Sequence, residues 1–367
     1  PLFQMNRLKK SNLTASKRKN GKSLSGTKVD TFAFISHPES ISQVKNHWPL
    51  MKLVPRCCVK PFLKVLPPFK VSKITNLRSL KGEELRGYFI FLPVLPLDIN
   101  ELSEEAVMGK IISAGHIFQK LGVKIIGLGG YFSVFSDKGS FAADELKIAL
   151  TSGNCLTAWS VYEAVYRMAR VKKRQLKDST LAIIGAATPI GMLCAKKFLP
   201  EAAKIAINDG DHRKLEDLRS ILLKMRPEAQ IIVEDKSSDA VKDADIVIIA
   251  VATAGALFNW GELKSGSIAC DVSLPRSFPQ AAAKRSDISL ITGGLIKLPH
   301  CVNLGINMGL PENIIYADLA ETLLLALEEK FSNYSLGDNI NVDKLEEIAN
   351  IAVRHGFEVW VPDAPLL

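Results

Sequence analysis

Residues 180–198 read TLAIIGAATPIGMLCAKKF, and the fold assignment starts from them. Thr180–Ile184 is an unbroken apolar run, which is typical of a strand buried on both faces of a parallel sheet. The turn Gly185–Gly191 follows and opens a predicted helix over Met192–Phe198. A strand, a glycine turn and a helix in this order predict the first βα unit of a nucleotide-binding sheet.

Strands and helices keep alternating downstream of this unit. A helix is predicted over His212–Met225, between two of four further predicted strands. These strands are Lys204–Ile207, Gln230–Val233, Ile246–Val251 and Ser267–Val272. This spacing predicts an α/β fold with a doubly wound parallel sheet of the Rossmann type. We assign this nucleotide-binding domain to residues 176–300.

The flanking regions carry other patterns. Residues 31–175 predict an N-terminal α/β substrate domain, in which Lys52–Arg86 is expected to be irregular with short strands because four prolines interrupt it. Residues 301–367 predict a helical C-terminal region, with helices over Glu312–Phe331 and Asn341–His355. Asn341 is a suitable N-cap, and Gly356 is a suitable end.

Composition and charge narrow the class of protein. The chain has 367 residues, of which 47% are apolar, enough to bury a sizeable core. Its six cysteines include no CxxC pair, so we expect a reducing, cytoplasmic environment and no metal site. The sequence contains no run of about 18 apolar residues, so we expect no membrane-spanning helix. Of the net charge of +9, residues 1–30 carry most, as eight Lys or Arg against Asp30. We expect this tail to be disordered, with peripheral membrane contact as its candidate role and no nucleic-acid partner.

The glycine turn is the candidate cofactor site. Glycines at both ends permit the tight turn and close helix packing, and the helix N-terminus faces a pyrophosphate. After the second strand, Asp209 favours the ribose hydroxyls of NAD, whereas Arg213 favours the extra phosphate of NADP, and the sequence leaves this choice open. The predicted cofactor-binding residues are Gly185, Ala186, Thr188, Pro189, Ile190, Gly191, Asp209, Arg213, Ala252, Thr253, Gly293 and Gly294.

Cys301 is the candidate nucleophile. It follows the last predicted sheet elements, where the nicotinamide end of a dinucleotide is expected, and a thiolate captures carbonyl carbon well. His300, which is adjacent to it in the sequence, is the second predicted catalytic residue. A small buried filler is the alternative interpretation of this cysteine.

From about Phe32 onward the chain resembles the cyanobacterial-type long-chain acyl-[acyl-carrier-protein] reductases. The matching stretches occur in the family's order: Phe34–His37, Leu128–Ser133, Thr151–Asn154, Ile184–Ala186, Ile190–Gly191, Gly293–Gly294, His300–Cys301, Ala320–Glu328 and Val353–Phe357. The resemblance implies reduction of a fatty acyl thioester to the aldehyde with NADPH, although NADH is not excluded. It also implies that Cys301 accepts the acyl group and that Ser133 and Asn154 lie near the substrate.

Three positions depart from the family pattern. Thr188 replaces the middle glycine of the turn, Gly210 stands where a basic residue is expected, and the segment between Cys301 and Ala320 is shorter. Our prediction remains an NAD(P)H-dependent, aldehyde-forming acyl-thioester reductase, with acyl carrier protein as the acyl donor and acyl-CoA as the alternative. An aldehyde-consuming enzyme is a further expected partner. A dehydrogenase like shikimate dehydrogenase or glutamyl-tRNA reductase, and a non-catalytic nucleotide sensor, are the alternatives.

Overall fold

The computed structural model describes residues 30–38, 41–47, 53–55, 59, 62–63, 66–95, 98, 102–135, 145–251, 259–273, 285–337 and 340–362. The basic tail, Cys57, Cys58, Ala252 and Thr253 lie outside these ranges. Among the helices in these ranges, none is both long and apolar enough to cross a membrane.

A six-stranded sheet forms one lobe of the molecule, in the order β11-β10-β9-β6-β7-β8. All of its strand pairs are parallel, which confirms the doubly wound nucleotide-binding fold expected from the sequence. Its strands are β6 (Thr180–Ile184), β7 (Lys204–Asn208), β8 (Gln230–Val233), β9 (Ile246–Ile249), β10 (Ile268–Asp271) and β11 (Ser289–Thr292).

Helices cover both faces of this sheet. Alternate residues of β6 point in opposite directions, so Leu181 and Ile183 join one buried cluster while Ala182 and Ile184 join another. The first cluster contains residues of α6 (Asn154–Val171), α7 (Pro189–Phe198) and α8 (His212–Met225), and the second contains residues of α9 (Ser237–Val241). Burial on both faces explains why these strands read as continuous apolar runs.

The second lobe contains a five-stranded sheet in the order β2-β3-β1-β4-β5. Only the β2–β3 pair is antiparallel. Phe32 and Phe34 face the cluster that extends into the first lobe, whereas Ala33 and Ile35 face the cluster that contains α4. The elements are β1 (Asp30–Ser36), α1 (Ile41–His47), β2 (Phe69–Arg78), β3 (Glu84–Phe91), α4 (Glu104–Gln119), β4 (Ile125–Leu128) and β5 (Ala149–Thr151).

Strand β2 corrects the expectation of irregular structure over Lys52–Arg86. It has ten residues and pairs with β3 along most of its length. The prolines that suggested irregularity all precede Phe69, so none removes a hydrogen bond from this strand. Two register shifts and the left-handed backbone of Asn76 (φ 63°) interrupt the alternation of apolar and polar residues that identifies a strand in a sequence.

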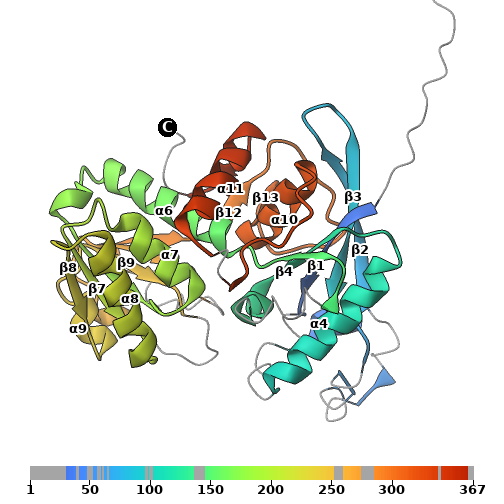
Figure 1. The fold of residues 1–367 in the computed structure, drawn as a ribbon, viewed down its shortest axis with the longest axis horizontal. Coiled ribbons are helices and arrows are strands. Elements are labelled where there is room, and N and C mark those ends of the chain that lie inside the picture. Colours follow the sequence, from blue (N-terminus) through green and yellow to red (C-terminus); the bar gives the residue numbers. More distant parts are fainter. Residues whose placement is uncertain are drawn as a thin grey trace, which may run out of the picture.

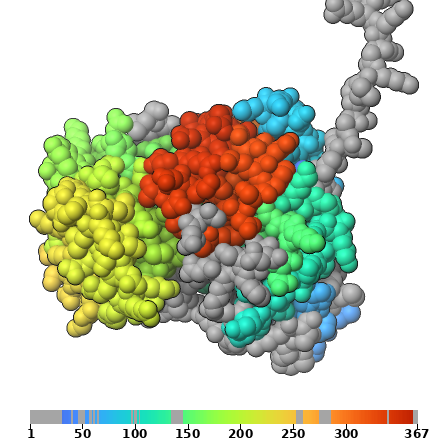
Figure 2. Space-filling model, in the orientation of Figure 1, coloured from blue at the N-terminus to red at the C-terminus, as the bar shows by residue number. Residues whose placement is uncertain are grey.

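The C-terminal region lies between the lobes and packs on both (Figure 1). Helix α10 (Ala317–Leu327) contacts β1, β4 and α6, while α11 (Val342–Arg354) contacts α6 and α7. In the view of Figure 2 these residues, coloured orange to red, cover the junction of the lobes. The region is not wholly helical, because β12 (Leu295–Lys297), β13 (Ile314–Tyr316) and β14 (Glu358–Val359) form a small antiparallel sheet.

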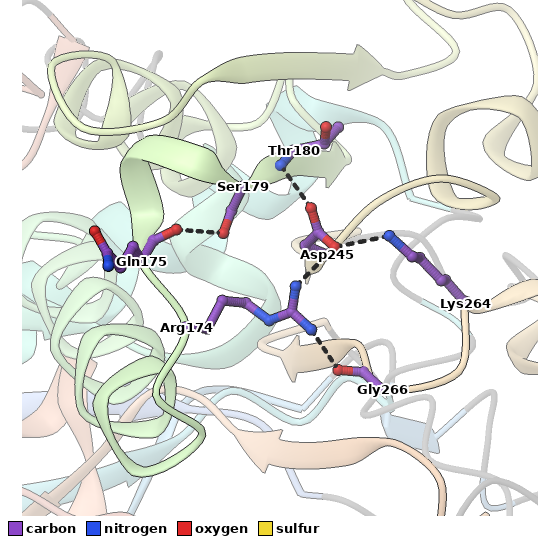
Figure 3. A network of polar contacts seen from close by, with 7 residues as sticks. All are labelled: Arg174, Gln175, Ser179, Thr180, Asp245, Lys264 and Gly266. Carbon is purple, nitrogen blue, oxygen red and sulfur yellow. Dashed lines mark hydrogen bonds and ion pairs between the residues drawn. The ribbon is translucent and has the colours of Figure 1, made fainter.

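A polar network fixes the passage from α6 into β6 (Figure 3). Asp245 accepts hydrogen bonds from Arg174 Nη1 at 2.7 Å, from Lys264 Nζ at 2.8 Å and from the Thr180 amide at 3.0 Å. Arg174 also donates to the carbonyl of Gly266 at 3.0 Å. These residues lie near the amino ends of β6, β9 and β10, whereas the glycine turn follows the carboxyl end of β6. The network therefore stabilises the end of the sheet that lies opposite to the glycine turn.

Candidate active site

The glycine turn has the close packing that a nucleotide-binding turn requires. Gly185 has a φ of 83°, and a Cβ on it would lie 2.7 Å from the carbonyl carbon of Ala250. A Cβ on Gly191 would lie 2.2 Å from the carbonyl oxygen of Gly185. Both positions therefore require glycine, and α7 is held directly against the end of β6.

Thr188 is the N-cap of α7, at the position where the family has a glycine. Its hydroxyl accepts a hydrogen bond from the Gly191 amide at 3.1 Å and donates to the carbonyl of Gly185 at 2.7 Å. Pro189 follows as the first helical residue, where its missing N–H has no consequence. The departure at Thr188 thus preserves the turn, since the side chain satisfies a helix N-terminus.

A cavity of about 490 Å³ opens where the two lobes meet. Much of its wall is apolar and comes from both lobes, with Phe34, Phe89 and Phe91 on the five-stranded sheet and Ile190 and Val272 on the nucleotide-binding lobe. Gly294 also lines the cavity, whereas Gly293 is packed so closely that a Cβ on it would lie 3.0 Å from Cys270 Sγ. Ala186 is fully buried beside the turn.

Polar groups gather at one end of the cavity, near Gly130 at the start of the 3₁₀ helix η2 (Gly130–Phe135). Asp318, in the first turn of α10, accepts a hydrogen bond from the Gly130 amide at 3.0 Å. Ser133 donates to the carbonyl of Gly130 at 2.7 Å, and Asn154 donates to Ser133 O at 3.3 Å and to Ser152 Oγ at 2.8 Å. Ser133 and Asn154, which the family resemblance places near the substrate, lie in contact on the cavity wall.

His37 and Tyr131 complete the polar end, although neither was predicted from the sequence as a site residue. Their rings lie 5.4 Å apart, and the Tyr131 amide lies 3.5 Å from His37 Nε2. Burial lowers the pKa of His37 to about 4, so its imidazole is neutral near pH 7, and burial raises the pKa of Tyr131 to about 12. The Tyr131 hydroxyl is buried and has no hydrogen-bond partner within the described residues.

A buried carboxylate supports this end of the cavity from behind. Glu321 of α10 is fully buried and accepts hydrogen bonds from the Leu156 amide at 2.8 Å and from Thr151 Oγ1 at 2.5 Å. Burial raises the pKa of Glu321, while these hydrogen bonds act in the opposite direction. Glu321 thereby fixes the N-terminal turn of α6, which carries Asn154.

Cys301 lines an adjoining groove of about 530 Å³ rather than the cavity itself. The residues Ile306, Asn307 and Met308 line both spaces and form a shared wall. Cys301 is exposed, whereas the other cysteines in the described ranges, Cys155, Cys194 and Cys270, are buried. Its exposure makes Cys301 the accessible thiol of this set, and burial raises the pKa values of Cys155 and Cys194 to about 12.

The segment that carries Cys301 runs along the outer edge of β2. Asn76 donates to the carbonyl of Cys301, and Thr75 and Asn303 form a β-bridge. His300 Nε2 lies 3.3 Å from the Arg78 amide and 3.2 Å from the carbonyl of Asn76. His300 therefore contacts the backbone of β2, and the sequence adjacency of His300 and Cys301 does not by itself bring their side chains together.

On the other side of the glycine turn, Asp209 follows β7 directly. Its carboxylate accepts hydrogen bonds from the amides of Ala187 and Asp211 and lines a second groove. Arg213 is exposed on the first turn of α8. The described residues contain no group of three His, Cys, Asp or Glu side chains placed to bind a metal ion.

Comparison with known proteins adds distant similarity. No protein-family model matches the chain. It is 25% identical over 345 residues to aminotransferase PigE of a Serratia species, covering 90% of this chain but only 39% of PigE. It is also 25% identical over 317 residues to the long-chain acyl-[acyl-carrier-protein] reductase of Synechococcus elongatus, covering 81% of this chain and 89% of that protein. Among solved structures, a quinate dehydrogenase from Corynebacterium glutamicum in complex with NAD overlaps 88% of this chain and 99% of that one, at 10% identity and a TM-score of 0.40.

Proposed function

We propose that this protein is an oxidoreductase that uses a nicotinamide dinucleotide to reduce a fatty acyl thioester to the aldehyde. The observation that carries the proposal is the cavity at the lobe junction, which combines an apolar wall from the five-stranded sheet with Ile190 of the glycine turn. An accessible thiol, Cys301, lies in the groove across the shared wall Ile306–Met308. Similarity to an acyl-[acyl-carrier-protein] reductase over 89% of its length supports the same reaction.

The turn residues 185–191 hold the pyrophosphate, and Ile190 and Gly294 line the cavity that receives the nicotinamide. Ala252 and Thr253 remain predicted contacts outside the described residues. When bound, NADH or NADPH supplies a hydride to the acyl carbon.

Cys301 divides the reaction into two easier steps. Its thiolate attacks the thioester carbonyl, a new C–S bond forms, and the bond to the donor thiol breaks as that thiol takes up a proton. After reduction, the C–S bond of the thiohemiacetal breaks, which releases the aldehyde and regenerates the thiol of Cys301. Hydrogen bonds that Asn76 and the Arg78 amide of β2 donate to the Cys301 carbonyl and to His300 Nε2 hold this segment in place, so His300 acts as a positioning residue in this proposal.

The exposure of Cys301 suits an acyl group delivered by a second macromolecule, and we propose acyl carrier protein as the donor, with acyl-CoA as the alternative. Carrier proteins present a thioester on a flexible arm, and an exposed thiol at a sheet edge is open to such an arm. The product aldehyde is reactive and apolar, so an aldehyde-consuming enzyme is the expected next partner.

Intact-mass measurement after incubation with acyl-CoA or acyl carrier protein, in the absence of nucleotide, tests the covalent step. The wild-type chain should gain the mass of one acyl group, and peptide mapping should place it on Cys301. Cys301→Ser should lose both the thioacyl adduct and aldehyde formation while keeping nucleotide affinity. An adduct on Cys57 or Cys58, or aldehyde formation by Cys301→Ser, would show that the nucleophile is assigned wrongly.

One observation favours a second candidate, a dehydrogenase that transfers hydride directly to or from a carbonyl or alcohol. The described residues that line the cavity include His37, Asp318 and Tyr131 but no cysteine. In that case Cys301→Ser would keep full activity on a small ketone or hydroxy acid, and no acyl adduct would form on the wild-type chain. Aldehyde formation that requires Cys301 excludes this candidate and the non-catalytic sensor together.

A further inference from the structure

A second groove, of about 530 Å³, lies on the far side of the glycine turn from the cavity. It is lined by Asn208 at the end of β7, by Asp209, Gly210 and His212 beyond it, by residues 235–238 at the start of α9, and by Asn259 and Glu262. The amides of Gly185 and Ala186 donate to the carbonyl of Asn208, so the turn joins the groove to the cavity. A dinucleotide whose pyrophosphate rests on the turn would place its adenosine half in this groove.

The carboxylate of Asp209 is fixed at the mouth of this groove. Its Oδ2 accepts a hydrogen bond from the Ala187 amide at 3.2 Å, and its Oδ1 accepts one from the Asp211 amide at 3.1 Å. Ala187 belongs to the turn itself, so the carboxylate is held against the segment that receives the pyrophosphate. A carboxylate still has free lone pairs after accepting two hydrogen bonds, and adjacent ribose hydroxyls can donate to them.

The charge of the groove disfavours an added phosphate. The described lining residues include three acids, Asp209, Asp235 and Glu262, against Lys236 and His212. His212 lies 3.5 Å from Asp235, and Lys214 lies 3.9 Å from Asp211, so these two basic side chains already face carboxylates. Arg213, the residue that favoured NADP in the sequence, is exposed on α8 and does not line the groove. A phosphate monoester carries close to two negative charges near pH 7 and would meet Asp209.

We infer that this protein selects NADH over NADPH and that Asp209 is the residue that sets this selectivity. The inference rests on the dinucleotide site of the proposed function but not on the identity of the thioester. It opposes the NADPH preference that the family resemblance implies. The physical reason is that Asp209 accepts hydrogen bonds from a free ribose diol and repels a phosphate at the same position.

The inference is tested by titrating the full chain with NADH and with NADPH in the absence of any thioester. Nucleotide fluorescence and calorimetry give the two dissociation constants. Wild-type protein should bind NADH at least tenfold more tightly than NADPH. Asp209→Ser should weaken NADH binding by about tenfold, because it removes charge-assisted hydrogen bonds, and should bring the ratio of the two dissociation constants close to one. Asp217→Ser, an exposed position on α8 outside the groove, is the matched control and should leave the ratio unchanged.

A gain-of-function variant makes the test stricter. Gly210 has open space around it, with nothing within 4 Å of a Cβ placed there. Asp209→Ser combined with Gly210→Arg removes the carboxylate and adds a guanidinium, so NADPH should become the preferred nucleotide. Circular dichroism of each variant checks that the fold is intact.

Tighter or equal binding of NADPH by the wild-type chain overturns the inference, as does a ratio that Asp209→Ser leaves unchanged. If NADPH binds tightly and supports aldehyde formation, the selectivity is wrong but the proposed function stands. If NADH binds selectively and no acyl adduct forms, the proposed function fails while the role of Asp209 stands. Absence of binding by either nucleotide refutes the dinucleotide site and the inference with it.

Discussion

Gly191→Ala probes the packing of the glycine turn with a single methyl group. The added Cβ would lie 2.2 Å from the carbonyl oxygen of Gly185 and 2.8 Å from the Cα of Ala186, whereas ordinary contact begins near 3.4 Å. Both neighbours are backbone atoms, so relief requires α7 to move away from the end of β6 by about an ångström. Overpacking of this kind costs about 1–3 kcal/mol of unfolding free energy, and we expect the upper end of that range.

Denaturant unfolding and nucleotide titration measure the two consequences of this substitution. Because the shift of α7 moves the amides that face the pyrophosphate, the affinity for NADH should fall at least tenfold, or about 1.4 kcal/mol. Gly109→Ala, on α4 in the other lobe and with nothing within 4 Å of the added Cβ, is the control and should lower neither the unfolding free energy nor the affinity for NADH. If Gly191→Ala unfolds at the wild-type denaturant concentration and binds NADH normally, the turn is not packed as described.

Three further predictions concern the network, the cavity histidine and the cavity wall. Burial alone would raise the pKa of Asp245, but hydrogen bonds from Lys264 and Thr180 and the charge of Arg174 hold this pKa below its ordinary value. Asp245→Asn should therefore lower the free energy of unfolding by about 1–3 kcal/mol at pH 7. That cost should shrink as the pH falls below about 4, because the wild-type carboxylate is then protonated too; an equal cost at pH 3 and pH 7, by urea unfolding, would contradict this. Burial lowers the pKa of His37 to about 4, so protonation of this side chain favours the unfolded chain. The unfolding free energy of the wild-type chain should therefore fall by about 2–3 kcal/mol between pH 7 and pH 4.5. The His37→Asn variant should not show this loss. If the cavity holds the acyl chain, kcat/KM should rise about fourfold for each added methylene of the substrate until the cavity is full. Met308→Trp, on the cavity wall, should move the optimum to shorter acyl chains. Met225→Trp, at an exposed position on α8, is the control and should leave the optimum unchanged.

The parallel sheet was predictable because its strands are buried on both faces, and Thr180–Ile184, His212–Met225 and Gln230–Val233 have the predicted bounds. The N-cap role of Asn341 is also confirmed, through the hydrogen bond from the Lys344 amide. Ile314–Tyr316 was assigned to the following helix, since three apolar residues directly before a helical pattern do not distinguish a short strand from a first turn. The strand β13 exists because β12 pairs with it, which is a tertiary contact.

The candidate site was only partly predictable, for a related reason. The glycine turn, Asp209, Ser133 and Asn154 stand in recognisable local patterns or in the family resemblance. His37 enters the site through its contact with Tyr131, 94 positions away along the chain, and Asp318 through its contact with Gly130, 188 positions away. Such contacts depend on the order of strands in the five-stranded sheet, and a single sequence gives that order no local signal.

The position of α10 has a consequence for the order of events during synthesis. The ribosome releases β1 and β4 long before it releases residues 317–327, yet α10 covers the face of the sheet that contains Phe32 and Phe34. Until then this lobe displays an unprotected aromatic surface, of the kind that chaperones bind on nascent chains. The nucleotide-binding lobe, whose sheet strands are contiguous in sequence, should therefore reach protease resistance on stalled ribosomes first, although it is translated second.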